Sequence, residues 1–197
     1  MIEKSYEEIW QQYLSSIHKD NLEFNELCNI VNKYAKLYNV DPFLILGIVY
    51  TESSGNPNAE SFTIDKNGNK KIIARGLMQL TPIAIKEVNN IYNRYFIFDD
   101  MLNPEANVEC GVLLFKHYLE YWKKNAIEPF ALQLALLSYS WGITSVINWL
   151  TKTKPDNGFI DEAISETKQY YNESVTFWYM KTKAVVEELL KGEIKNG

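Results

Sequence analysis

The sequence predicts a mostly α-helical domain with one small β-hairpin, and three observations support this fold class. First, a capping residue is followed by proline at three points, each ahead of a run rich in apolar residues, which is typical of helix starts. Second, apolar residues recur with the helical period along much of the chain. Third, residues 63–73 place β-branched residues on both sides of an Asn-Gly turn, which is typical of a hairpin. The three capping pairs are Asp41-Pro42, Thr81-Pro82 and Asn103-Pro104.

Length and composition favour one domain over residues 1–197, because 46% apolar and 14% aromatic residues suffice for a well-packed core. The net charge of −5 speaks against nucleic acid as a partner. The longest apolar run, residues 42–50, is far shorter than the roughly 20 residues that span a bilayer, so we expect no membrane anchor. The acidic and polar N-terminus lacks the apolar core of a secretory signal peptide.

We expect additional N-terminal helices within residues 1–39. One is expected over residues 3–17. The segment 21–39 is amphipathic, and we expect its apolar side to pack beside the helix that starts at Pro42. Its apolar residues recur three and four positions apart: Leu27, Ile30, Val31, Tyr34, Ala35 and Tyr38.

The helix that starts at Pro42 carries the most informative acidic residue of the chain. Residues 43–50 are almost free of polar atoms, which predicts a helix buried on all sides. Glu52 follows about 15 Å along that helix, and the Ser-Ser-Gly-Asn-Pro sequence of residues 53–57 then ends it. Apolar surroundings raise the pKa of a carboxyl group and allow it to donate a proton near neutral pH. The alternative is an exposed glutamate at a helix C-terminus.

The hairpin of residues 63–73 has a superficial likeness to a calcium-binding loop. Lys70 stands where an EF-hand needs glycine, and Gly76 stands where it needs the bidentate glutamate, so we expect no calcium. Cys28 and Cys110 are expected to be buried free thiols, and neither histidine has a partner at ligand spacing. The sequence therefore predicts no metal site and no cofactor.

Further helices are predicted by the same signals. Their expected ranges are 82–91, 104–124, 129–139, 143–150, 159–180 and 182–191. In the second of these, Gly111 allows the close approach of another helix, and the core stripe consists of Val108, Val112, Phe115, Leu119 and Trp122. Gly142 separates two helices, and residues 152–158 form a solvated loop.

Five short motifs follow one another in a characteristic order. They are Glu52-Ser53, Gly76-Leu77-Met78-Gln79 with Pro82, Asn107 with Gly111, Ser138-Tyr139-Ser140-Trp141-Gly142, and Glu166-Thr167 with Tyr170. Over about residues 40–180 the chain thereby resembles the goose-type-lysozyme-like catalytic domain of soluble lytic transglycosylases (SLT). It departs from the family pattern at Ser140, where an asparagine is expected, and between residues 61 and 76, which is longer than in the simplest members.

The resemblance implies a lysozyme-like multi-helix domain whose single catalytic acid and base is Glu52. It also implies that Ser61 and Gln79 contact the sugars near the scissile bond and that Met78 lines the saccharide groove. Hydroxyl and amide groups can hydrogen-bond to sugars, and methionine offers an apolar face. From the residues alone, Met78 as a core residue and Ser61 as a turn residue remain open alternatives.

Three later residues acquire roles from the same resemblance. Tyr139 and Glu166 match family residues around the catalytic glutamate, and Tyr170 matches the aromatic residue of the last motif. From the residues alone, Glu166 can also be a solvated helix residue.

The implied reaction is cleavage of the β-1,4 bond between N-acetylmuramic acid and N-acetylglucosamine in peptidoglycan, with formation of a 1,6-anhydro ring. One alternative is a goose-type muramidase that hydrolyses this bond, with Asp65 as the candidate second carboxylate. Another is a noncatalytic wall-binding or structural module. We expect a monomer whose partner is the glycan strand of the cell wall, in the periplasm, outside the cell or in a phage virion.

Overall fold

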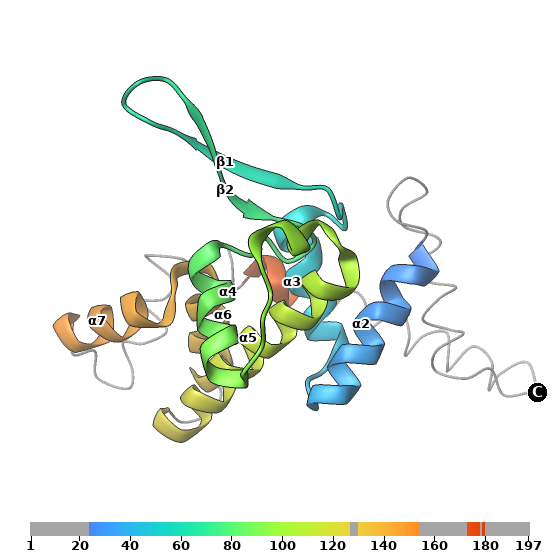
Figure 1. Cartoon of the computed structure of the whole chain (residues 1–197). Helices are drawn as coiled ribbons and strands as arrows, with labels where there is room; N and C mark the ends of the chain where they lie inside the picture. The colour runs from blue at the N-terminus through green and yellow to red at the C-terminus, as the bar shows by residue number, and fades with distance from the viewer. Residues whose placement is uncertain (1–23, 127–129, 154–172, 178, 180–197) are drawn as a thin grey trace, which may run out of the picture.

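The computed structural model describes residues 24–126, 130–153, 173–177 and 179, and most of them are helical (Figure 1). The helices are α2 (Phe24–Tyr38), α3 (Pro42–Ser53), α4 (Pro82–Tyr92), the 3-10 helix η1 (Phe98–Leu102), α5 (Pro104–Asn125), α6 (Phe130–Trp141) and α7 (Ile143–Thr153). The strands are β1 (Glu60–Ile64) and β2 (Lys70–Arg75). The predicted mostly α class with one hairpin is confirmed, while η1 was not predicted.

All three predicted capping pairs start helices. In each pair the side chain of the first residue accepts a hydrogen bond from a backbone N–H of the first turn, and proline takes the first helical position, where its missing N–H costs nothing. Asp41, Thr81 and Asn103 accept these bonds from Phe43 (2.9 Å), Ala84 (3.2 Å) and Ala106 (3.1 Å). Local chemistry therefore fixes where α3, α4 and α5 begin.

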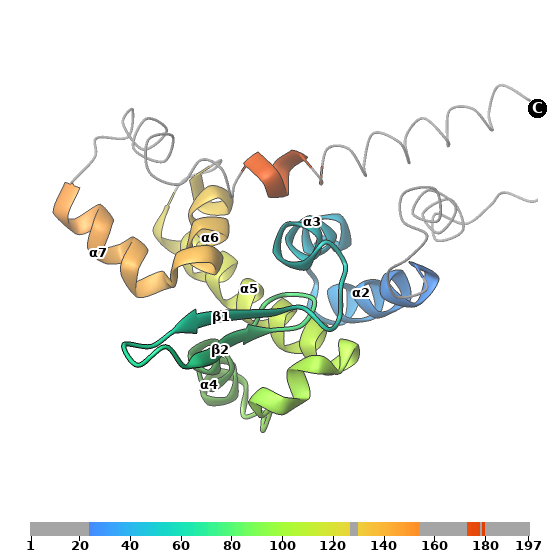
Figure 2. The ribbon, with the colours of Figure 1, turned by 90° about the horizontal axis from the view of Figure 1, so that it is seen from above.

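The core forms around α5, which packs against α2, α4 and α6. Figure 2 looks nearly along the axis of α3, which lies beside α2 as the sequence predicted. Residues 43–50 of α3 are all buried, in agreement with a helix that is apolar on every side. Of the predicted stripe on α5, only Leu119 remains half-buried.

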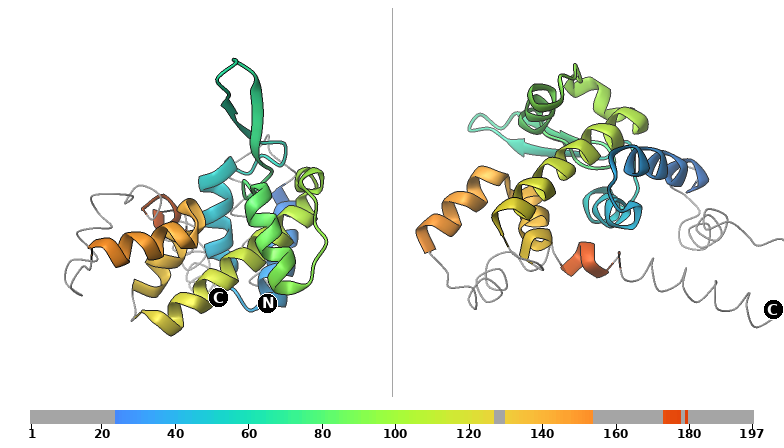
Figure 3. Two further views of the ribbon diagram at one scale, coloured as in Figure 1. Left: turned by 60° about the vertical axis from the view of Figure 1, so that its left-hand side comes forward. Right: turned by 90° about the horizontal axis from the view of Figure 1, so that it is seen from below.

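The two strands form an antiparallel hairpin that projects from the helices (Figure 3). It is longer than predicted, because it extends back to Glu60 and forward to Arg75. The turn is held by the Asp65 carboxylate, which accepts hydrogen bonds from the backbone N–H groups of Asn67 and Asn69, both at 2.8 Å. Gly68 supplies the left-handed backbone that the turn requires, with φ of 84°.

Helices α6 and α7 are separated at Gly142, as predicted, where φ is 86°. The predicted start of the loop over residues 152–158 was wrong, because α7 continues through Lys152 to Thr153. Within the described ranges no single helix is long and apolar enough to cross a membrane, and α6 and α7 reach that length only together, across a bend of 118°.

A short helical stretch near the C-terminus, residues 173–177, lies against α3. A Cβ atom at Gly47 would lie 2.9 Å from the carbonyl oxygen of Val175, so glycine allows the two backbones to approach. The helices expected over residues 3–17 and 182–191, and most of the one over 159–180, lie outside the described residues.

Candidate functional site

Glu52 lies in the last turn of α3, where the buried helix reaches the surface. Its side chain is partly buried, directly after the eight buried residues of that helix. Ser54 ends the helix in the left-handed conformation, with φ of 55°, and its N–H donates to the carbonyl of Tyr50 at 3.1 Å. The Ser53 hydroxyl donates to the carbonyl of Val49 at 3.1 Å, so it satisfies a backbone acceptor of the helix end.

The loop between β2 and α4 is a closed turn around Gly76. The backbones of Arg75 and Leu80 exchange two hydrogen bonds, of 3.2 and 3.0 Å. Gly76 has φ of 79°, and a Cβ atom there would lie 2.1 Å from the carbonyl oxygen of Met101. Only glycine fits this position. Its N–H donates to the carbonyl of Ala59 at 2.8 Å, which ties the loop to the chain just ahead of β1.

The structure brings Ser61 and Gln79 together at the base of the hairpin. The Ser61 hydroxyl donates to the Gln79 side-chain oxygen at 2.7 Å. The Gln79 side-chain nitrogen donates to the carbonyls of Ala59, at 3.1 Å, and Gly76, at 2.9 Å. Gln79 has a positive φ of 47°, which is uncommon for a residue with a side chain. These three hydrogen bonds offset the strain of that backbone.

The side chain of Asn107 on α5 holds the same loop through three hydrogen bonds. Its side chain is 1% exposed, accepts from the Met78 N–H at 2.8 Å, and donates to the carbonyls of Arg75 at 2.9 Å and Met101 at 3.0 Å. Sequence reasoning used Asn107 only as a motif residue and missed this role. The available signal was a polar side chain next to the apolar stripe of a core helix, which needs buried partners.

Met78 occupies the core, which corrects the expectation that its side chain lines a groove. The side chain is 0% exposed and lies against Gly111, where a Cβ atom would come within 2.3 Å of the Met78 sulfur. Gly111 thus accommodates a methionine side chain and not, as expected, another helix. The alternative interpretation of Met78 as a core residue therefore describes this structure, and what Met78 contributes to the site is its backbone.

Tyr139 connects the loop with the catalytic candidate. Its hydroxyl donates to the carbonyl of Met78 at 2.9 Å, and its ring packs edge-on against Phe115. Burial, and next the negative charge of Glu52, raise the pKa of the Tyr139 hydroxyl well above its usual range. The loop that Tyr139 contacts is in turn bonded, from the Gly76 N–H, to the carbonyl of Ala59 in the segment that follows Glu52 and α3. Tyr139, the loop at residues 76–79 and the segment after Glu52 are therefore connected by hydrogen bonds.

Asp65, the candidate second carboxylate, is an exposed residue of the hairpin turn. Hydrogen bonds from the backbone and side chain of Asn69, and from the backbone of Asn67, lower the pKa of its carboxyl group. Glu60, the first residue of β1, accepts from the Arg75 guanidinium at 2.8 Å, and the same guanidinium donates to Asp99 at 2.5 Å. Both hairpin carboxylates thus have structural partners.

Two expected site residues, Glu166 and Tyr170, lie outside the described residues. Cys28 and Cys110 are buried free thiols, as predicted. In the part of the chain that the structure describes, no three His, Cys, Asp or Glu side chains are arranged to hold a metal ion.

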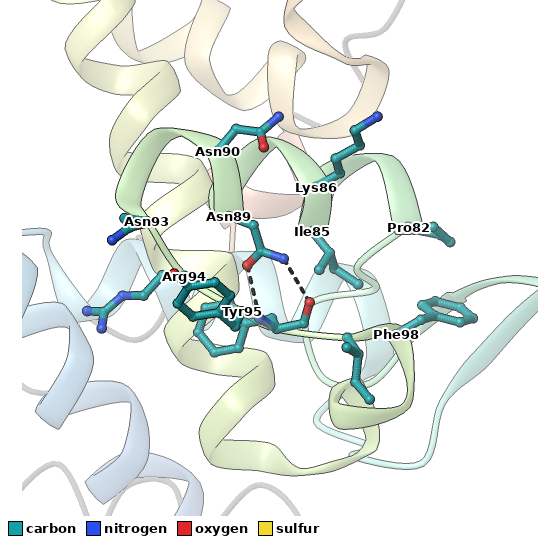
Figure 4. A pocket seen from close by; sticks show the side chains of 11 residues that line it. Pro82, Ile85, Lys86, Asn89, Asn90, Asn93, Arg94, Tyr95 and Phe98 are labelled. Carbon is teal, nitrogen blue, oxygen red and sulfur yellow. Dashed lines mark hydrogen bonds between the residues drawn. The ribbon is translucent and has the colours of Figure 1, made fainter.

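A separate pocket of about 650 Å³ lies between α4 and the loop that follows it (Figure 4). Asn89 shapes this loop, because its amide exchanges two hydrogen bonds with the backbone of Phe96, of 2.8 and 3.0 Å. The residues that line the pocket include none of the site residues described above.

Comparison with known proteins gives consistent matches. A model of the family described as the Transglycosylase SLT domain matches residues 29–160. The transglycosylase of Enterobacteria phage PRD1 is 34% identical over 128 residues, which cover 65% of this chain and 39% of that protein. The membrane-bound lytic murein transglycosylase C of Haemophilus influenzae (strain PittGG) is 30% identical over 154 residues, 74% of this chain and 38% of that protein. The chain thus spans less than two fifths of either relative.

A solved structure confirms the predicted lysozyme-like fold. The lytic transglycosylase Slt from Pseudomonas aeruginosa, solved as an inactive mutant, superimposes with a TM-score of 0.55 at 20% identity, over 89% of this chain and 28% of that one.

Proposed function

The chain belongs to the Transglycosylase SLT domain family, and from that premise we propose that it is a peptidoglycan lytic transglycosylase whose single catalytic acid and base is Glu52. The observation that carries the proposal is the position of Glu52. It is a partly buried carboxyl group directly after the buried residues 43–50 of α3, and the segment that follows it is hydrogen-bonded at Ala59 to Gly76 of the loop of residues 76–79.

The first step of the proposed reaction is a proton transfer. Glu52 donates its proton to the glycosidic oxygen as the bond from that oxygen to C1 of N-acetylmuramic acid breaks. The carbonyl oxygen of the substrate's own N-acetyl group stabilises the positive charge that develops at C1, as in substrate-assisted glycosidases.

The second step returns the proton. The ionised Glu52 accepts the proton of the C6 hydroxyl while the C6 oxygen bonds to C1 and closes the 1,6-anhydro ring. No water is consumed, and Glu52 ends the cycle protonated. One carboxyl group that alternates between acid and base is therefore sufficient.

Ser61 and Gln79 are the proposed sugar contacts. Their mutual hydrogen bond of 2.7 Å holds both side chains at the base of the hairpin, on β1 and on the loop that follows β2. The Ser61 proton and both N–H groups of Gln79 are used in hydrogen bonds within the protein, so the two side-chain oxygens are the groups that can accept hydrogen bonds from sugar hydroxyls. Tyr139 is proposed to position the loop, through its bond to the Met78 carbonyl. Glu166 and Tyr170 remain proposals from the motif.

The structural roles of the two hairpin carboxylates favour the anhydro product over hydrolysis. A hydrolysing muramidase would need a second carboxylate to activate water, for which Asp65 was the candidate. Asp65 is committed to the hairpin turn, and Glu60 is committed to Arg75. These contacts support a mechanism with one acid.

The place of action follows from the substrate. The relatives carry the names of a phage transglycosylase and of membrane-bound lytic murein transglycosylases. We therefore propose that this protein acts as a monomer on glycan strands of the cell wall, in the periplasm, outside the cell or in a phage particle.

The direct test of the catalytic role is Glu52→Gln, because an amide keeps the shape of the side chain but cannot donate and recover a proton. General acid and base groups contribute at least about 100-fold to rate, so we expect a loss of that size in the release of muropeptides from purified sacculi. Glu26→Gln, at an exposed position on α2, is the matched control and should retain full activity. Circular dichroism checks that both variants fold. Residual activity of Glu52→Gln within about tenfold of wild type would refute the assignment.

A further inference from the structure

The hairpin is a cationic arm on an acidic protein. Residues 61–74 carry three lysines and one aspartate, a net charge of +2, whereas the whole chain has a net charge of −5. Lys66, Lys70 and Lys71 are all exposed, and none forms an ion pair with any residue that the structure describes. The single acid, Asp65, is occupied by the turn. The hairpin therefore presents positive charge without an internal counter-charge.

One face of the hairpin also exposes apolar side chains. Phe62 pairs across the strands with Ile72, and Ile64 pairs with Lys70, so these four side chains share a face. Phe62 is 51% exposed and Ile64 is 64% exposed, and the Lys70 ammonium lies 4.1 Å from the centre of the Phe62 ring. Two-stranded hairpins are only marginally stable alone, and an uncovered apolar face with free edges favours association. Such a face indicates a binding surface.

The hairpin is continuous with the proposed catalytic site. Its base carries Ser61, which is bonded to Gln79, and its Lys-rich turn is the part that projects furthest from the helices (Figures 1 and 3). A polymer bound at Glu52 would therefore have the hairpin alongside it.

We propose that the hairpin binds the stem peptides of peptidoglycan, with its lysines contacting peptide carboxylates and its apolar face contacting the aliphatic peptide side chains. This inference rests on the proposed function, which makes peptidoglycan the substrate. Stem peptides combine free carboxylates with small aliphatic groups, which matches the two kinds of side chain on this arm. The remainder of the protein is acidic and therefore repels an anionic wall polymer. The positive charge of the hairpin provides a local attraction for that polymer.

The test compares two double variants, both in the Glu52→Gln background so that the substrate is not consumed. Lys66→Gln with Lys70→Gln removes two exposed hairpin charges, of which Lys70 shares the apolar face. Lys123→Gln with Lys124→Gln removes two exposed charges at the end of α5, on the side of the molecule away from the hairpin in Figures 1 and 3. Binding to purified sacculi is measured by co-sedimentation at several salt concentrations. Binding to neutral N-acetylglucosamine oligomers, which lack stem peptides, is measured alongside.

The expected result is that the hairpin variant binds sacculi about three- to tenfold more weakly than the parent and with a weaker salt dependence. The α5 variant should match the parent, and neither pair should alter binding to the neutral oligomers. Equal sacculus binding by the hairpin variant and the parent overturns the inference. An equal loss with the neutral oligomers also overturns it, since the contact would then be to sugar. Failure of the catalytic proposal is detected separately, because it would appear as retained activity in Glu52→Gln on its own.

Discussion

Replacing Asn107 by alanine should destabilise the protein by about 3 kcal/mol. The substitution removes three hydrogen bonds of 2.8 to 3.0 Å from a side chain that is 1% exposed. The cost arises mainly from the partners left behind, because a buried polar group without a partner costs about 1–3 kcal/mol. The Arg75 carbonyl keeps its bond from the Leu80 N–H, so the Met78 N–H and the Met101 carbonyl bear most of the loss.

Thermal or urea unfolding measures this loss directly. At about 2–4 °C per kcal/mol for a chain of this size, the melting temperature of Asn107→Ala should fall by about 6–12 °C. Asn125→Ala is the matched control, because that exposed amide makes one bond, to the Tyr121 carbonyl at 2.7 Å. It should lose less than about 0.5 kcal/mol. Equal stabilities of the two variants would refute the conclusion that the Asn107 side chain stabilises the loop at residues 75–80.

Two further predictions concern the interior around this site. Gly111→Ala should cost about 1–3 kcal/mol, since its Cβ atom would come within 2.3 Å of the Met78 sulfur. Adding Met78→Ala should recover at least about 0.5 kcal/mol relative to the sum of the single variants, and strict additivity would contradict the contact. Burial raises the thiol pKa of Cys28, and it raises that of Cys110 to about 12. In the unfolded chain a thiol ionises at a pH of about 8.5, while the native thiols stay protonated. The free energy of unfolding should therefore fall as the pH rises above that value. A thiol reagent should label either cysteine only after unfolding.

Features fixed by neighbours in sequence were predictable. Asp41, Thr81 and Asn103 cap helices because the bonds they accept come from residues two or three positions further on. The position of Glu52 at the end of a buried helix was predictable from the apolar run that precedes it. The hairpin was also predicted, but its length was not, because the pairing of Glu60 with Arg75 depends on a side-chain contact at the base.

Features fixed by distant partners were not predictable from pattern. Asn107 reaches Met78 across 29 positions, and Tyr139 reaches the same residue across 61. Whether Met78 faces a groove or the core depends on the space that Gly111 leaves, which periodicity does not reveal. The 3-10 helix η1 is held by Asp100, whose carboxylate accepts from the Ile97 N–H at 2.9 Å, in a stretch too short to show a period.

The central claim, that Glu52 acts alone and closes an anhydro ring, is tested most directly by the mass of the product. Muramoyl ends released from purified sacculi by the wild-type protein should be one water lighter than hydrolysed ends, and they should resist borohydride reduction because they have no reducing end. Glu52→Gln should release neither form. A digest in which nearly all muramoyl ends are hydrated and reducible would contradict the mechanism, and loss of activity in Asp65→Asn would then identify the two-carboxylate muramidase.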